Sequence, residues 1–355
     1  MIRVRVKLII TAVIFLTAVI FVVWSVTKLE KYYDIAEFVF RDDIREQISD
    51  LRSREIISVN VVDRYVNMYA SEEAGRTEEV TVYAVDPGFR DFIPNRMVHS
   101  NFLVDLKPVF MRGQVIIGES LAVALFARTD AADSDVLING MNYSVIGVIA
   151  KDNVLIDIFG SLEKHAVYVY SGDVQAGLKP ERTSLIVKCR ENTAGMVLSG
   201  ISASGLNAIA EINHDAKARF NVFASQFLLL IGICMILRSL IKQLVLKLRD
   251  NKRVGYINRV NFIYIVFIII FISAALYLLS GLRFVLDARM IPGTLANFGV
   301  IFNKIREWFY LVNTGMVNGG LLSVSLNLYA RLAVYSSLVS VISGWLFSKY
   351  MLSIS

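Results

Sequence analysis

Long uncharged apolar runs separate charged segments along this chain. Residues 8–27 contain no charged side chain and are long enough, as a helix, to cross a hydrocarbon core of about 30 Å. Three further apolar segments follow at 220–237, 260–281 and 332–350. The pattern predicts an α-helical membrane protein with four transmembrane helices. Because no small-residue cleavage site precedes Lys28, we interpret the first run as an uncleaved anchor and not as a signal peptide.

The segment between the first two apolar runs, residues 28–219, has the pattern of a folded domain. It contains short β-type runs, and helical stretches at 119–127 and 193–209 interrupt them. Residues 28–54 have few turn formers and predict a helix. This alternation predicts an α+β domain inserted after the first helix. The β-type runs are 56–62, 78–85, 114–118, 135–139, 142–150, 165–170 and 183–189.

A hairpin signal stands between two of these runs, at Asn139 and Gly140. A type I′ turn needs φ > 0 at both central residues, and the Asn-Gly pair adopts that conformation readily. The pair therefore predicts a tight hairpin within the inserted domain. We interpret the hairpin as an element that stiffens the domain.

Charge is divided unevenly between the inserted segment and the rest of the chain. Residues 28–219 hold 21 Lys and Arg against 28 Asp and Glu, whereas the remainder holds 16 against 3. The basic excess lies in short clusters beside apolar runs, which argues against a nucleic-acid-binding face and fits the positive-inside rule. Residues 238–259 carry seven Lys and Arg with one Asp and are expected to be cytoplasmic. Four crossings then place both termini in the cytoplasm and residues 28–219 outside it.

The sequence has no pattern for catalysis, cofactor binding or metal binding. His99, His165 and His214 stand far apart without metal-ligand spacing, and we interpret each as an ordinary surface or strand-end residue. Neither a phosphate-binding G-x-x-x-x-G-K-[ST] loop nor a G-x-S-x-G nucleophile motif occurs. The apolar runs hold almost no ionisable side chain, which disfavours a polar pathway through them. Anchoring, dimerisation or force transmission remain as roles for these helices.

The clearest candidate for a functional segment follows the second apolar run. Residues 238–249 continue its helical pattern, with apolar side chains on one face and basic side chains elsewhere. Such a segment can dock on a cytoplasmic partner or lie at anionic lipid headgroups. A second amphipathic stretch, 295–312, predicts an interfacial helix on the outer side. The candidate residues of the cytoplasmic segment are Arg238, Lys242, Lys247, Arg249, Asp250, Lys252, Arg253 and Gly255.

The order of these elements resembles the permease subunits of MacB/FtsX-like (type VII) ABC transporters. Residues 113–150, "GQVIIGESLAVALFARTDAADSDVLINGMNYSVIGVIA", are similar to that family's periplasmic core: a strand, a helix ending in Leu-Phe, an acidic loop, and a hairpin closing on V-I-G-V. Residues 80–92 and 165–170 resemble flanking strands of the same core. The resemblance implies a MacB-like periplasmic core domain at 28–219 in a protein of the bacterial cytoplasmic (inner) membrane.

The resemblance also implies partners. Such permeases form dimers and work with a separate ATPase, so we expect a homodimer or a heterodimer, an ATPase on another chain, and no enzymatic activity or cofactor in this one. Residues 252–255, "KRVG", stand where the family has R-E-I-G, and Arg253 replaces the usual acidic residue. The connection at 282–331 is longer than the tight outer loop of the family. Both departures concern the segments next to the third helix.

Three functions fit this organisation. The first is a permease subunit that exports or extracts a peptide, lipoprotein, antibiotic or similar amphipathic substrate. The second is an FtsX-like mechanotransmission regulator of a cell-wall hydrolase, or a membrane sensor without transport. The third is a membrane-anchored assembly protein without energy coupling. Membrane lipids are expected contacts, and a periplasmic or cell-surface partner is a further option. We divide the chain into 1–27, 28–219, 220–259 and 260–355.

Overall fold

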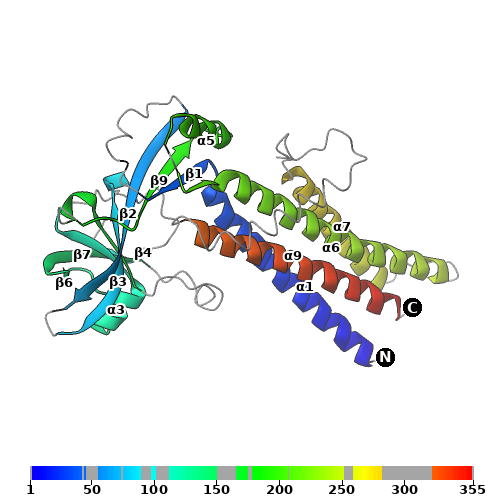
Figure 1. The fold of residues 1–355 in the computed structure, drawn as a ribbon. Helices are drawn as coiled ribbons and strands as arrows, with labels where there is room; N and C mark the ends of the chain where they lie inside the picture. The colour runs from blue at the N-terminus through cyan, green and yellow to red at the C-terminus, as the bar shows by residue number, and fades with distance from the viewer. Residues whose placement is uncertain are drawn as a thin grey trace. The chain divides into compact units, whose positions relative to one another are not determined.

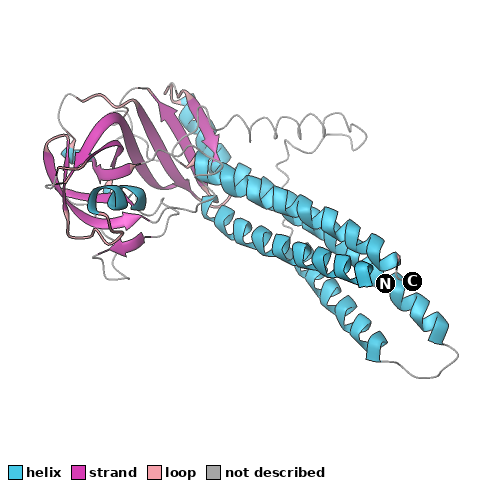
Figure 2. Cartoon of the chain, turned by 90° about the horizontal axis from the view of Figure 1, so that it is seen from below, coloured by secondary structure: helices cyan, strands magenta, loops and turns pink. Residues whose placement is uncertain are grey.

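The computed structural model describes most of the chain and divides it into two compact units. One unit comprises Met1–Lys31, Ala216–Val312 and Tyr329–Ser355, and the other comprises Tyr32–Asp215 and Asn313–Leu328. We call them the helical unit and the sheet unit (Figures 1 and 2). The described residues are 2–41, 44, 55–72, 75–88, 97–100, 112–149, 165–174, 178–206, 208–251, 259–281 and 322–353.

The helical unit is built from long apolar helices. In the described part of the chain these are α1 (Ile2–Leu29), α6 (His214–Asn251), α7 (Arg259–Gly281) and α9 (Ser323–Leu352), and the first turns of α6 and α9 belong to the sheet unit. Three of these helices have segments long and apolar enough to cross a membrane, at Val6–Tyr32, His214–Leu246 and Leu326–Met351. They overlap three of the four spans predicted from the sequence. The fourth span, on α7, stays a prediction.

The surface and the contacts of these helices explain why they are apolar all round. On α1, Ile9, Leu16 and Ile20 are exposed, whereas Phe15 and Val22 are buried. Exposed aliphatic side chains on a helix of this length match a lipid environment. Ring contacts join α1 to α9 and α7: Trp24 with Tyr329, whose ring centroids lie 5.5 Å apart, and Phe15 with Phe271 at 6.3 Å.

The sheet unit contains one mixed, ten-stranded sheet. Its strand order is β10-β1-β9-β2-β3-β8-β5-β7-β4, and β6 pairs with β2 and β7 outside this path. The pairs β3–β8 and β5–β7 are parallel and the other pairs are antiparallel. The strands are β1 (Ile35–Phe40), β2 (Ile56–Ser71), β3 (Thr77–Val85), β4 (Met97–Ser100), β5 (Gln114–Gly118), β6 (Asp135–Ile138), β7 (Met141–Ile149), β8 (Ala166–Tyr170), β9 (Arg182–Cys189) and β10 (Ala210–Asn213).

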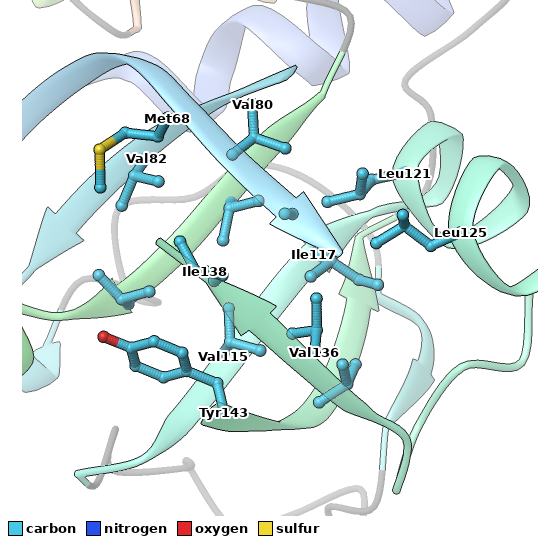
Figure 3. Close-up of a cluster of buried hydrophobic side chains, with 14 of the residues drawn as sticks. Met68, Val80, Val82, Val115, Ile117, Leu121, Leu125, Val136, Ile138 and Tyr143 are labelled. Atoms are coloured by element: carbon cyan, nitrogen blue, oxygen red, sulfur yellow. The ribbon is translucent and has the colours of Figure 1, made fainter. Parts of the chain in front are cut away.

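In the described part of the sheet unit, two helices pack on this sheet, each over its own hydrophobic core. The helix α3 (Glu119–Phe126) buries Leu121 and Leu125 completely, and Figure 3 shows both side chains pointing toward Ile117 of β5. The helix α5 (Ala194–Ala203) buries Val197 and Ile201 in a second cluster with side chains of β1 and β9. The predicted α+β domain is therefore observed as a sheet-rich α+β fold.

The β-type runs of the sequence all fall on strands, but the prediction of a helix at 28–54 is wrong at 35–40, and residues 42–43 and 45–54 lie outside the described residues. Within that range Ile35–Phe40 forms β1, and all six of its residues are buried. A strand covered on both faces shows no alternation of apolar and polar residues, so its pattern cannot be told from a helix over this length. The strands β4 and β10 were not predicted either; with four residues each, they are too short to show a pattern. The predicted interfacial helix at 295–312 lies outside the described residues.

Candidate coupling site

The predicted cytoplasmic segment begins as a continuation of α6. This helix has 38 residues, which at 1.5 Å per residue gives a length of about 57 Å. It starts at the last strand of the sheet, β10, and ends at Asn251, next to the basic residues that follow. Arg238, Lys242 and Arg249 are exposed on it. Lys247 and Asp250 lie on the same helix, and Lys252, Arg253 and Gly255 lie outside the described residues.

The final part of α6 has two different faces. Leu240 and Gln243 are buried, and the Gln243 Nε2 group donates a hydrogen bond of 2.6 Å to the carbonyl oxygen of Met351, near the end of α9. Ile241, Val245 and Leu248 are 43%, 56% and 44% exposed. The apolar face predicted for 238–249 is thus divided, because one edge packs on α9. The remaining stripe, flanked by exposed basic side chains, is open to lipid or to a partner.

At the other end, α6 begins at a buried side-chain contact with the sheet. The Nε2 atom of His214, the first residue of α6, lies 2.8 Å from Glu37 Oε2 on β1, and both side chains are fully buried. The next residue, Asp215, accepts a hydrogen bond of 2.9 Å from the backbone N–H of Asp34. We call Asp34, Glu37, His214 and Asp215 the junction.

The junction was not predicted. His214 does follow directly on a strand, β10, but its side chain is fully buried, so the interpretation of it as an ordinary surface residue is wrong. His214 and Glu37 are separated by 177 positions in the sequence. No local pattern joins residues so far apart. The only signal was a lone Glu in an apolar stretch, "IAEFVF", and it was interpreted as part of a helix.

The candidate hairpin is hydrogen-bonded to the neighbouring strand β2. Asn139 and Gly140 have φ of 46° and 81° and form the two-residue turn between β6 and β7. The N–H of Asn139 donates to the carbonyl oxygen of Tyr69 at 3.0 Å, and the N–H of Tyr69 donates to Asn139 Oδ1 at 3.1 Å. The turn is therefore held against β2 by two hydrogen bonds as well as by its own strand pairing. This arrangement limits bending at that end of the sheet.

Two buried acidic groups of the sheet unit have raised pKa values. Burial, with the Asp34 and Asp215 carboxylates nearby, raises the pKa of the Cys189 thiol from 9.0 to about 12. Burial, with Asp173 nearby, raises the pKa of the Tyr143 hydroxyl from 10.0 to about 12. Because the thiolate is the reactive form of cysteine, Cys189 is expected to be chemically inert in the folded protein.

These two shifts predict how stability depends on pH. The unfolded chain loses the two protons near pH 9 and 10, whereas the folded chain keeps them up to about pH 12. Unfolding therefore releases protons above pH 9, and each group should lower stability by about 1.4 kcal/mol per pH unit between its unfolded and folded pKa values. Well below pH 9 these two groups contribute no pH dependence. Denaturant unfolding at pH 8, 9.5 and 11 measures this slope. A Tyr143→Phe, Cys189→Ala double variant with the slope of the wild type would contradict the prediction.

Comparison with known proteins identifies the family. The family model for the MacB-like periplasmic core domain matches residues 8–196, which is more than half of the chain. The chain belongs to this family. The resemblance to MacB/FtsX-like ABC permeases is thereby confirmed, and this MacB-like chain is a member of a permease family of ABC-type transporters. No curated protein sequence matches it.

Solved structures similar to this MacB-like chain are distant in sequence. The periplasmic region of MacB from Actinobacillus actinomycetemcomitans is 14% identical with a TM-score of 0.38, and the match covers 52% of this chain and 90% of that one. The extracellular domain of the noncanonic ABC-type transporter YknZ from Gram-positive bacteria is 17% identical with a TM-score of 0.34, and the match covers 48% of this chain and 88% of that one.

Proposed function

We propose that this protein is the transmembrane subunit of an ABC-type transporter, in which a separate ATPase subunit drives movement of the sheet unit. The substrate class would be a peptide, lipoprotein, antibiotic or similar amphipathic molecule that is exported or extracted. The observation that carries the proposal is α6, which runs without interruption from His214 at the sheet to Asn251 at the basic segment. A helix is stiff along its axis because its backbone hydrogen bonds are internal. Displacement at one end therefore reaches the other.

The proposal includes a membrane arrangement. Four spans, with α7 as the third, would place both termini and residues 238–259 in the cytoplasm and residues 28–219 outside it, in the bacterial cytoplasmic membrane. The exposed residues Arg238, Lys242 and Arg249 would then face the ATPase, together with Lys247, Asp250, Lys252, Arg253 and Gly255. A dimer of two permease chains, identical or different, would pair with the two ATPase subunits. Buried small and polar side chains on α9, such as Ser337 and Ser340, suit packing between helices and give no evidence of a polar path.

Reversing charge on the end of α6 should uncouple the ATPase. In an Arg238→Glu, Lys242→Glu variant, we expect binding of the ATPase subunit to weaken by at least about tenfold, or about 1.4 kcal/mol, because both side chains are exposed and would meet a complementary surface. The measurement is co-purification of the ATPase with the full chain from the native host and its ATP turnover.

The matched control is Lys179→Glu, which reverses an exposed charge in the sheet unit and should leave both quantities unchanged. Thermal unfolding of each variant establishes that the fold is retained. If no ATPase co-purifies with the wild-type chain under any condition, the proposed function is wrong. Normal ATPase binding by the double variant would exclude this part of α6 as the contact.

A further inference from the structure

Two of the long helices, α1 and α6, join the sheet at one pair of strands. The chain leaves α1, passes through a 3-10 turn (Glu30–Tyr32) and enters β1, whereas β10 passes directly into α6. β1 and β10 pair antiparallel, with Ala36 opposite Asn213 and Val39 opposite Ala210. The start of α6 is therefore continuous with this strand pair.

The start of α6 is linked to the β1–β10 strand pair in two ways: by the backbone, since β10 continues into α6, and by the side chains of the junction. The His214–Glu37 contact of 2.8 Å lies between α6 and β1, so it crosses from one of the two entering segments to the other. The Asp34–Asp215 hydrogen bond makes a second such crossing. The Tyr32 ring, itself 1% exposed, lies 6.3 Å from the His214 ring. Separating a buried, paired Glu and His leaves an uncompensated charge or polar group, so this contact resists opening.

The hydrogen-bonding environment of His214 favours one tautomer of its imidazole ring. Within the described structure the buried Nδ1 atom of His214 has no hydrogen-bond partner. A proton on Nδ1 would therefore be a buried donor without an acceptor. The tautomer that fits carries its proton on Nε2 and donates it to Glu37. The second Glu–His pair in the sheet unit, Glu78 with His165, is longer at 3.7 Å, and its Glu side chain is 41% exposed.

We infer that the junction is a rigid joint through which α6 moves the sheet, with Glu37 and His214 as its positioning residues. The inference rests on the proposed function for the origin of the force, but the rigidity of the joint is independent of it. The physical basis is that two contacts join the start of α6 to β1 and to the residue before it: the fully buried His214–Glu37 contact, and the hydrogen bond from the Asp34 N–H to Asp215. A displacement of α6 then tilts β1 and β10 together and does not bend the chain between β10 and the helix.

Cys189 reports on the joint without any partner protein. It is fully buried, and its N–H donates a hydrogen bond of 2.7 Å to the Asp34 carbonyl oxygen. In the full chain with Cys234→Ser, we expect slow modification of Cys189 by a maleimide at pH 8. His214→Ala should raise the rate by at least about tenfold, because local opening exposes the thiol. His214→Gln keeps an amide donor for Glu37 and should give an intermediate rate, whereas His165→Ala should give the wild-type rate.

Coupling is measured with the ATPase that co-purifies with the wild-type chain. For the wild type, we expect ATP with vanadate to change hydrogen exchange of the β1 and β10 amides. For His214→Ala, we expect ATP hydrolysis within about twofold of the wild type but loss of the nucleotide-dependent change in exchange. His214→Gln should restore part of that change, which a general loss of folding would not permit.

The possible outcomes separate the joint from the proposed function. Unchanged Cys189 labelling in both His214 variants would overturn the inference, and so would a His165→Ala variant that labels as fast as His214→Ala. A normal nucleotide-dependent exchange change in His214→Ala would overturn it as well. If the wild type captures no ATPase, the proposed function fails, and the labelling rates alone decide whether the joint is rigid. If His214→Ala does not fold, the His214→Gln and Glu37→Gln variants supply the same comparison.

Discussion

Leu121→Ala should lower the stability of the sheet unit by about 2–5 kcal/mol. Leu121 lies on α3, is fully buried, and belongs to the cluster that fills the space between α3 and strands β5, β6 and β7. Figure 3 shows the Leu121 side chain beside Ile117, in the interior of this cluster. Removing it takes away apolar contacts and leaves a cavity that the sheet cannot close, because β5 is paired on both sides. The difference in the free energy of unfolding between the variant and the wild type is measured by denaturant unfolding of the full chain, monitored by near-ultraviolet circular dichroism.

The same helix supplies the control. Val123 is 48% exposed on α3, so Val123→Ala shortens an apolar side chain of the same helix without opening the core. Its effect should stay within about 0.5 kcal/mol. If both variants unfold at the same denaturant concentration, α3 does not anchor this part of the sheet, and the core described around it is wrong.

The region around α3 is also the part of the fold that the sequence predicted best. The runs at 114–118, 135–139 and 142–150 alternate or are continuously apolar, and the Asn139-Gly140 pair fixes where one strand returns. These signals are local, because a strand or a turn depends on neighbouring residues. The order of the strands is not local. Nothing in the sequence pattern indicates that β9, near the end of the domain, lies between β1 and β2.

The junction is a second example of contacts between distant residues that local sequence patterns do not predict. Glu37 was predicted within a helix and His214 as an ordinary strand-end or surface residue, whereas the structure buries them together. A buried carboxylate requires a partner, and the sequence does not specify which distant residue supplies it. The predicted cytoplasmic segment at 238–249 was different. Its apolar and basic positions predicted a helix over 238–249, and α6 continues through it.

Hydropathy located the long helices but not their ends. The second apolar run covers 220–237, whereas α6 extends from His214 to Asn251. Hydropathy marks only the part of a helix that suits lipid, while polar residues such as Asp215 and Arg249 extend the same helix beyond it. It also says nothing about which faces of two apolar helices meet. That information depends on small residues at matching heights.

Gly344→Ala should destabilise the helical unit because α6 and α9 approach each other through their glycines. A Cβ atom on Gly344 would lie 2.8 Å from the carbonyl oxygen of Gly232, and a Cβ atom on Gly232 would lie 2.9 Å from the carbonyl oxygen of Ser340. Both obstacles are backbone atoms, which cannot rotate away, so the helices must move apart. We expect a loss of about 1–3 kcal/mol for either alanine variant, and more for Gly344→Leu. Thermal unfolding of the full chain in detergent measures it.

The Gly200→Ala variant separates crowding from the ordinary effect of replacing a helical glycine. Gly200 lies on α5, where an added Cβ would meet no atom within 4 Å, so alanine there should stabilise by about 0.5–1 kcal/mol. Opposite signs for Gly200→Ala and Gly344→Ala are therefore expected. If Gly344→Ala also stabilises, α6 and α9 do not pack through this contact. The hydrogen bond from Gln243 on α6 to Met351 on α9 would then need another explanation, because it requires the two helices to remain in contact up to their C-terminal ends.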